Sequence, residues 1–484
     1  MSFNIVCFPI EISAYNIFTK MKTFGKAVGN KIIEYIPGFN YNYDDENDYY
    51  DDNYYYDNNC YDDNYNYDYN HNYNFYSNYD YGFYPFFNIN FVRNKNNNQI
   101  SNKNKHNNID SHNGNNNNNS INSVIENSNN NQQNQTHLRG LVNIASTCYM
   151  NSILQCFSHI PNLYNYFQKK QISDIANQLY SEKLLFPVFR EVLVELWNES
   201  NNSPYSPNKF KERLGDMNPL FKGAYPNDAK DLLTFILIQL HEELNHPKNS
   251  NMNNNNDLNN IEIQKNKKLM FEYFSKYFMN NNRSIISDLF FGIIYTKSDC
   301  LHCGISVYNY QLFNFLIFPL QKVLEYKMKM NNFQNNFNNT VSIDDCFKYS
   351  QSPTCLNDYY CNFCKKSKGC NYTTYLSVLP NIIIIIINRG KGIEYNINLS
   401  FDENINLKNY VEFLSDECMY ELFGVVTHYG DSSQSGHFVA RCISPLDQMW
   451  YLYNDSIIQK IGYFNKEEFY AGHPYILFYR KIKF

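Results

Sequence analysis

Apolar side chains recur at a helical spacing in two stretches of the chain. In residues 148–160 the apolar positions include Tyr149, Ile153 and Phe157, and Pro161 ends the run. Residues 228–244 carry apolar side chains on nearly every turn, which is typical of a largely buried helix. The spacing predicts one helix in each stretch.

After about residue 285 the pattern changes to short apolar runs that are typical of β-strands. The longest run, residues 382–387, consists of six isoleucines and indicates a fully buried strand. We expect strands at residues 289–295, 311–320, 375–387, 422–428, 437–442, 450–453 and 475–479. A helical part followed by a β-rich part predicts an α+β fold. No run approaches the roughly 18 apolar residues that a membrane span requires.

The composition changes sharply along the chain. Residues 41–82 are almost only Asn, Asp and Tyr, and residues 94–135 are rich in Asn. Neither stretch has the aliphatic side chains that would offset the entropy of ordering it. We therefore expect an N-terminal segment (1–40) of unknown role, a disordered low-complexity region (41–136) and a globular domain (137–484). Asn-rich stretches near 249–260 and 331–339 are predicted to be surface-loop insertions within that domain.

Charge and cysteine content narrow the class of protein. The 484 residues include 41 Lys and Arg against 47 Asp and Glu, and this acidic balance argues against a nucleic-acid-binding surface. The 13 cysteines are too few for a disulfide scaffold, and residues 1–10 lack the pattern of a secretory signal. We expect a reducing compartment, the cytoplasm or the nucleus, where spaced cysteines indicate metal binding or catalysis.

Cys148 is the candidate nucleophile. It lies where a loop becomes a helix, and the N–H groups of a helix N-terminus favour a thiolate. Asn143, five residues earlier, is a side-chain donor that suits an oxyanion. The alternative for any single cysteine is a buried structural role, which we expect for Cys156.

His437 is the candidate general base. It follows Gly436 at the start of one expected strand, and Asp455 follows the next strand. If the two strands are adjacent, the Asp455 carboxylate can orient the imidazole and leave one ring nitrogen for the thiol. His428 is expected to have a structural role, and His473 is expected to lie in a loop.

Two Cys-x-x-Cys pairs predict a metal site. The four cysteines match a tetrahedral zinc site with four thiolate ligands, which is structural because it leaves no open position. Gly304, directly after the first pair, suits a tight turn. Reduced cysteines without metal are the alternative, and neighbouring residues compete as ligands. The predicted ligands are Cys300, Cys303, Cys361 and Cys364, and the competitors are Cys355, Cys370 and His302.

These motifs together resemble the ubiquitin-specific proteases, which are papain-like cysteine deubiquitinases. Residues 140–155 resemble the family's cysteine box, and residues 420–428, 436–437 and 450–455 resemble its histidine box. Residues 471–479 are similar to the closing strand, and residues 227–233 and 240–245 to a helix between the boxes. The cysteine pairs resemble the zinc-bearing fingers. The motifs run in order over about 138–482.

The resemblance implies a helical thumb, a β palm and zinc-bearing fingers that hold ubiquitin. It implies hydrolysis of the bond after the C-terminal glycine of ubiquitin, with structural zinc and no catalytic cofactor. It assigns Cys148 as nucleophile, His437 as base, Asp455 as orienting residue and Asn143 as oxyanion-hole donor. It also implies that two acidic residues, Asp228 and Asp231, bind the basic tail of ubiquitin, for which carboxylates are suited.

The chain departs from the family pattern next to the nucleophile. Ala145 replaces a usual Gly, Ser146 replaces Asn or Ala, and Phe438 replaces the Tyr that commonly follows the histidine. Ala145 and Ser146 leave open a ubiquitin-binding scaffold with impaired catalysis. A protease for a ubiquitin-like modifier is a second alternative, because the same catalytic residues would serve it.

Overall fold

The computed structural model describes residues 138–246, 260–281, 283–331, 339–390, 393–412, 418–432 and 435–482. The expected segment 1–40 and the low-complexity region 41–136 lie outside these residues, as do most of the two Asn-rich insertions. Within the described ranges, no helix is both long and apolar enough to cross a bilayer.

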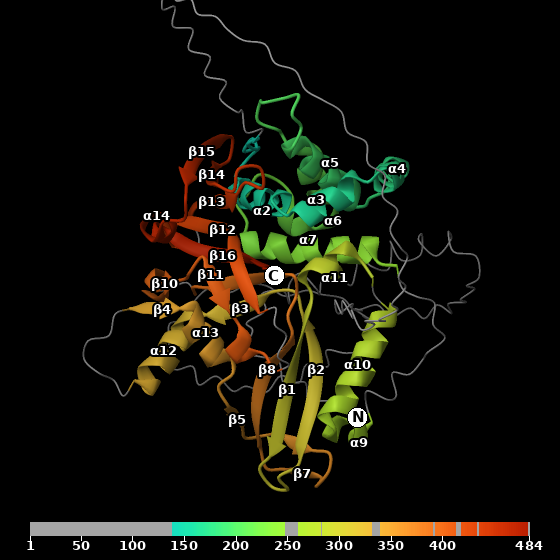
Figure 1. Ribbon diagram of the computed structural model, residues 1–484, viewed down its shortest axis with the longest axis vertical. Helices are drawn as coiled ribbons and strands as arrows, with labels where there is room; N and C mark the ends of the chain where they lie inside the picture. The colour runs from blue at the N-terminus through green and yellow to red at the C-terminus, as the bar shows by residue number, and fades with distance from the viewer. Residues whose placement is uncertain are drawn as a thin grey trace, which may run out of the picture.

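A helical layer, the thumb, forms the first part of the fold. Its central helix, α2 (Cys148–Ser158), is buried along all 11 residues. It lies between other thumb helices and the strands of the main sheet, where it contacts α5, α7 and β13 (Figure 1). Pro161 begins the next helix, as expected at a first helical position. The other thumb helices are α3 (Pro161–Gln168), α4 (Lys170–Gln178), α5 (Phe186–Leu196), α6 (Asn208–Met217), η2 (Pro219–Phe221) and α7 (Ala229–Leu244).

The palm is a sheet with strand order β15-β14-β13-β12-β16-β9-β3, and β11 pairs with β12. Its pairs are antiparallel except for β3 and β9, which are parallel. The isoleucine strand β9 lies inside the sheet with all six isoleucines buried, as predicted. The palm strands are β3 (Leu316–Pro319), β9 (Ile382–Asn388), β11 (Asn404–Asn406), β12 (Met419–Ser432), β13 (Ser435–Ile443), β14 (Trp450–Asn454), β15 (Ile457–Gly462) and β16 (His473–Lys481).

The fingers are a smaller sheet, with strand order β2-β1-β8-β5, that projects away from the palm (Figure 1). The helices α9 and α10 pack against β2 and give the fingers a separate hydrophobic core. A hairpin of β6 and β7 lies at the far end. These elements are α9 (Ile261–Lys265), α10 (Lys267–Asn281), β1 (Gly292–Cys300), β2 (Ser306–Phe313), β5 (Thr354–Leu356), β6 (Tyr360–Cys361), β7 (Lys366–Ser367) and β8 (Cys370–Val378).

Short elements complete the fold around the palm. A two-stranded parallel sheet pairs β4 with β10 beside α12 and α13. These elements are α11 (Ile285–Phe290), α12 (Leu320–Met330), β4 (Thr340–Ser342), α13 (Ile343–Ser350), η3 (Ile393–Asn396), β10 (Asn398–Ser400), η4 (Lys408–Tyr410) and α14 (Lys466–Tyr470).

The structure corrects three expected strands. The prediction over 289–295 is wrong in its first three residues, because a Ser284 capping box begins a helix that ends at Phe290, and β1 begins only at Gly292. The predicted strand 311–320 is two strands. The predicted strand 375–387 is also two, which break at Pro380 and enter different sheets. The helices α3 to α6 and those between residues 260 and 350 were not expected, and α10 lacks a clear apolar stripe.

The buried isoleucine strand provides a test of the core. Ile385 is fully buried, so we expect Ile385→Ala to lower the free energy of unfolding by about 2–5 kcal/mol. Ile457→Ala removes an isoleucine that is 65% exposed and serves as the matched control, with an expected change below about 0.5 kcal/mol. Chemical denaturation of both variants measures the difference. Equal losses in the two variants contradict the assigned core.

Candidate active site

Cys148 is the first residue of α2, as predicted from the sequence. Its side chain is only 7% exposed and lies at the helix N-terminus, where backbone N–H groups stabilise negative charge. The preceding loop is closed by a hydrogen bond from the Ile144 N–H to Thr147 Oγ1, at 3.0 Å. The packing of α2 thus fixes the position of the thiol.

His437 lies in β13, opposite Tyr429 of β12, and is hydrogen bonded to Cys148. Its Nε2 lies 2.7 Å from Oδ1 of Asn454, the last residue of β14. An amide oxygen only accepts a hydrogen bond, so Nε2 is the nitrogen that carries the donated hydrogen, and Nδ1 is left for the thiol. The structure therefore brings the predicted nucleophile and the predicted base together.

The hydrogen bond to Cys148 is the main cause that raises the pKa of His437 to about 9, against the opposing effect of burial. The hydrogen bond to Asn454 and the charge of Asp455 act in the same direction. An imidazolium that persists at neutral pH stabilises a thiolate beside it, which is the reactive form of cysteine.

Asp455 lies next to this pair, with its Oδ2 3.9 Å from His437 Nε2. The closer partner of the histidine is Asn454, which the sequence pattern did not single out. Asp455 has a left-handed backbone, with φ of 52°, and accepts hydrogen bonds on both carboxylate oxygens from two asparagines. Its orienting role toward His437 stays a prediction. The sequence feature that could have identified Asn454 is its position, directly before Asp455 at the end of the same strand.

Asn143 lies between Asp455 and the start of α2. Its Oδ1 accepts from the Thr147 N–H at 2.9 Å, and its Nδ2 donates to Asp455 Oδ2 at 2.9 Å. These two contacts fix which end of the amide is the donor. The second hydrogen on Nδ2 suits an oxyanion at Cys148, and this role stays a prediction.

The loop before Cys148 is strained where the chain departs from the family pattern. Ala145 and Ser146 have φ of 120° and 49°, a region that favours glycine. A non-glycine residue there costs on the order of 1 kcal/mol or more. The loop keeps this conformation without the usual glycine, because Asn143 and Thr147 bind each other across it.

Asp228 and Asp231 lie at the start of α7. Asp228 caps the helix through the Lys230 N–H, at 2.8 Å, and also accepts from the Tyr475 hydroxyl. Burial raises the pKa of Tyr475, so the tyrosine remains a donor to that carboxylate. Both acids are partly exposed, and their tail-binding role stays a prediction.

The other two candidate histidines lie close to Tyr395. His428 is buried in β12 and is hydrogen bonded to the Tyr395 hydroxyl. His473, which was expected in a loop, is instead the first residue of β16. The loop prediction rested on Pro474, but β16 is paired there with β12, at Thr427.

The two Cys-x-x-Cys pairs come together at the far end of the fingers. Sγ of Cys300 lies 3.9 Å from that of Cys364, and Sγ of Cys303 lies 3.7 Å from that of Cys361. All four sulfur atoms lie within 4.8 Å of one another. A tetrahedron of thiolates around zinc has edges of about 3.8 Å, so the cluster fits the predicted ion.

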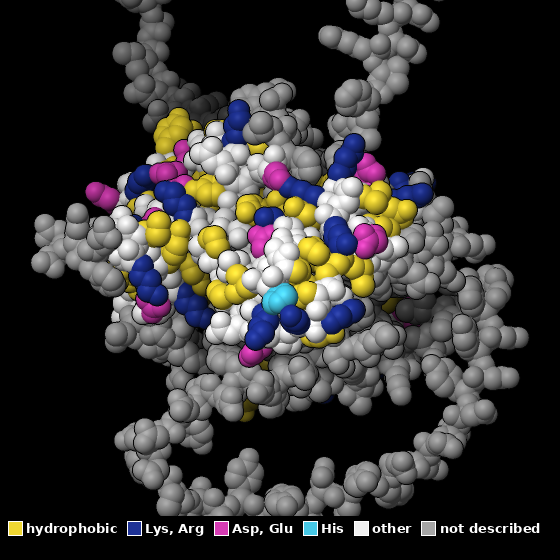
Figure 2. Space-filling view, turned by 90° about the horizontal axis from the view of Figure 1, so that it is seen from below, with side chains coloured by type: hydrophobic (Ala, Val, Ile, Leu, Met, Phe, Trp, Pro, Cys, Tyr) yellow, Lys and Arg dark blue, Asp and Glu magenta, His cyan; other side chains and the backbone are white. Residues whose placement is uncertain are grey.

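The two Cys-x-x-Cys pairs adopt the same type of turn. The residue after each second cysteine, Gly304 or Lys365, has a positive φ and donates its N–H to the carbonyl of the first cysteine. Cys355 is exposed and His302 binds Lys366, so neither belongs to the cluster. Figure 2 shows this end of the molecule, where basic and apolar side chains lie around one histidine.

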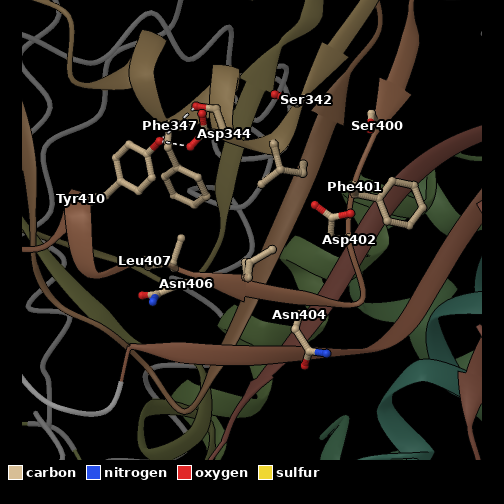
Figure 3. Close-up of a pocket in the computed structure, with 12 residues that line it drawn as sticks. Ser342, Asp344, Phe347, Ser400, Phe401, Asp402, Asn404, Asn406, Leu407 and Tyr410 are labelled. Atoms are coloured by element: carbon tan, nitrogen blue, oxygen red, sulfur yellow. Dashed lines mark hydrogen bonds between the residues drawn. The ribbon is translucent and has the colours of Figure 1, made fainter.

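A separate cavity of about 190 Å³ lies beside the palm. It is bounded by the start of α13 and the chain between Ser400 and Tyr410, with Asp344 and Asp402 at its rim (Figure 3). None of its lining residues belongs to the Cys148–His437 cluster, so the cavity has no part in the chemistry of that cluster.

Comparison with known proteins identifies the family of the chain. The model of the family described as "Ubiquitin carboxyl-terminal hydrolase" matches residues 139–479. The chain is 25% identical over 349 residues to human "Ubiquitin carboxyl-terminal hydrolase 2", covering 71% of this chain and 55% of that protein. It is 26% identical over 366 residues to mouse "Ubiquitin carboxyl-terminal hydrolase 3", covering 70% of this chain and 67% of that protein. The chain spans about half the length of several curated relatives it matches.

A solved structure confirms the expected fold. The structure titled "Structure of the SAGA Ubp8/Sgf11/Sus1/Sgf73 DUB module bound to ubiquitin aldehyde" contains a chain with a TM-score of 0.51 and 21% identity. The match covers 72% of this chain and 70% of that one. The expected architecture of helical thumb, β palm and fingers is therefore confirmed.

The contact between Cys148 and His437 predicts a titration. We expect the imidazole of His437 to titrate near pH 9, because the thiol partner stabilises its charged form. Cys148→Ala removes that partner, so the midpoint falls toward the ordinary value of about 6.5. NMR of the histidine side chains measures both. Cys156→Ala, another buried cysteine of α2, should leave the midpoint unchanged, and an unchanged midpoint in Cys148→Ala contradicts the pairing.

The thiolate cluster predicts one structural metal ion. We expect about one zinc per chain, and chelation should lower the melting temperature because the ion stabilises only the folded state. Metal analysis and thermal unfolding check this. Cys361→Ser should lose zinc, whereas Cys355→Ser removes an exposed cysteine outside the cluster and should keep it. Equal zinc contents would refute the ligand set.

Proposed function

Because the chain belongs to the ubiquitin carboxyl-terminal hydrolase family, of the ubiquitin-specific protease type, we propose that it is a thiol-dependent deubiquitinase. The reaction is hydrolysis of the bond after the C-terminal glycine of ubiquitin. The observation that carries the proposal is the hydrogen-bonded pair of Cys148 and His437, with Asn454 2.7 Å from the far ring nitrogen. A nucleophile, a base and an orienting group are what acyl transfer requires.

The first half of the proposed reaction forms a thioester. The Cys148 thiolate attacks the glycine carbonyl, and the carbonyl oxygen becomes an oxyanion. The Cys148 N–H and the Asn143 Nδ2 donate to it, and such donors stabilise the transition state more than the ground state. The imidazolium of His437 then gives its proton to the lysine amine as the carbon–nitrogen bond breaks.

The second half of the proposed reaction releases ubiquitin. His437 is now neutral and accepts a proton from water, which attacks the thioester carbonyl. The carbon–sulfur bond breaks, Cys148 recovers its thiolate, and ubiquitin leaves with a free carboxylate. Asn454 holds the ring in one orientation throughout, because its amide oxygen accepts from Nε2 in both protonation states of the imidazole.

Ubiquitin and ubiquitinated proteins are the proposed partners. Asp228 and Asp231 are proposed to bind the basic tail, since both lie partly exposed at the start of α7. Cys300, Cys303, Cys361 and Cys364 would hold a zinc ion that ties the two finger turns together and takes no part in the chemistry. We also propose a reducing compartment, the cytoplasm or nucleus, since none of the described cysteines forms a disulfide.

The test uses the full chain and ubiquitin that carries an electrophile at its C-terminus. We expect one covalent adduct by mass spectrometry, and none with Cys148→Ala. His437→Ala should slow turnover of a fluorogenic ubiquitin amide by roughly 10²–10⁴-fold, the usual contribution of acid–base catalysis. Cys355→Ser, which changes an exposed cysteine of the fingers, is the matched control and should form the adduct normally.

Two results would overturn the proposal. Tight ubiquitin binding without an adduct indicates a scaffold with impaired catalysis, for which the strained Ala145 and Ser146 provide the reason. An adduct only with a ubiquitin-like modifier that carries the same electrophile indicates a protease for that modifier.

A further inference from the structure

Asn151 is a buried amide in the first turn of the nucleophile helix, three residues after Cys148. Its side chain is 2% exposed. Its Nδ2 lies 2.8 Å from Asp455 Oδ1, and 3.4 and 3.3 Å from the carbonyl oxygens of Leu141 and Val142. All three neighbours are acceptors, so only the NH₂ end of the amide can face them.

The other end of this amide has no partner. Among the residues that the structure describes, none donates a hydrogen bond to Asn151 Oδ1, although that atom is enclosed. A buried carbonyl without a donor lowers the free energy of unfolding, and a leucine would fill similar space without that cost. Packing alone therefore does not account for an asparagine here, whereas the contact from Nδ2 to Asp455 does.

Asp455 connects three segments through its carboxylate and backbone. Oδ1 accepts from Asn151, Oδ2 accepts from Asn143 at 2.9 Å, and its carbonyl accepts from the Leu141 N–H at 2.9 Å. Gly140 allows this approach, because a Cβ there would lie 2.6 Å from the Ser456 carbonyl oxygen. The two asparagines thus hold the carboxylate from opposite sides.

From this arrangement we infer that Asn151 is a positioning residue for acyl transfer. It holds the Asp455 carboxylate, which in turn holds the Asn143 amide beside Cys148. Asn151 itself does not face His437, whose ring is held separately by Asn454. The inference rests on the proposed function for its natural substrate, but it makes a separate statement: attack by Cys148 on a carbonyl needs Asn151, whereas activation of the thiol does not.

The test compares two reactions of Cys148 in the full chain. The first is acyl transfer, read as turnover of a fluorogenic ubiquitin amide and as Cys148-dependent acylation by p-nitrophenyl acetate. The second is alkylation by iodoacetamide, which needs the thiolate but forms no oxyanion. We expect Asn151→Ala to lower kcat and the acylation rate on the order of 10- to 100-fold, with little change in KM. Alkylation should stay within about twofold.

Three further variants sharpen the comparison. Asn151→Leu keeps the volume if Asn151→Ala fails to fold, and it should lose acyl transfer in the same way. Ser152→Ala is the matched control, because that buried hydroxyl bonds only locally, to the Tyr149 carbonyl, and it should leave both reactions unchanged. Asn151→Ala combined with Asp455→Ala should be no slower than the worse single variant, since both act through one contact.

The outcomes distinguish the positioning role of Asn151 from the proposed deubiquitinase function. Unchanged acylation in both Asn151 variants overturns the positioning role, and so does an equal fall of acylation, alkylation and melting temperature, which marks a structural residue. If the wild-type chain does not turn over the ubiquitin amide, the proposed function fails. The ester and alkylation rates then still decide the role of Asn151.

Discussion

The burial of α2 on every side is the constraint from which the rest of the site follows. A helix whose 11 residues are all buried needs partners around it, and here the thumb helices and the palm strands supply them. Contacts of this kind leave the helix no freedom to slide or rotate. Its N-terminus, with Cys148, is therefore fixed relative to β13, which carries His437, and to β14, which ends at Asn454 directly before Asp455.

This rigidity allows the strained backbone around Cys148 to persist. Ala145, Ser146 and Asp455 all have positive φ, and each is expected to cost on the order of 1 kcal/mol or more. Such conformations are kept only where surrounding contacts determine them. Here the contacts are hydrogen bonds from Asn143 and Asn151 to one carboxylate, and both donors are anchored to α2 or to the loop that begins it. The strain is thus confined to these residues. The packing of α2 prevents the backbone from relaxing to a less strained conformation.

The sequence predicted those parts of the structure that depend on local pattern. The helices that begin at Cys148 and Ala229 and the isoleucine strand formed as expected. The order of apolar residues in each segment is enough to indicate both the type of element and its burial. The two cysteine pairs also came together as predicted, and each pair closes its own turn. The helices around residues 261–281 were missed, because they pack on the fingers through scattered aromatic side chains that give no clear stripe. Tertiary contacts decided those elements, and one sequence does not display them.

Asn454 and Asp455 are neighbours in the chain but have different partners in the site. Sequence favoured the carboxylate as the partner of His437, because a charged acceptor binds an imidazolium more strongly than an amide does. The structure places the amide closer, because Asn454 is the last paired residue of β14 and still lies in the sheet beside β13. Asp455 is past the strand end, and its left-handed backbone turns its side chain toward α2 instead. The change in backbone dihedral at Asp455 thus places the two neighbours on different sides of the site. Asn454 holds the base, and Asp455 contacts the asparagines near the nucleophile.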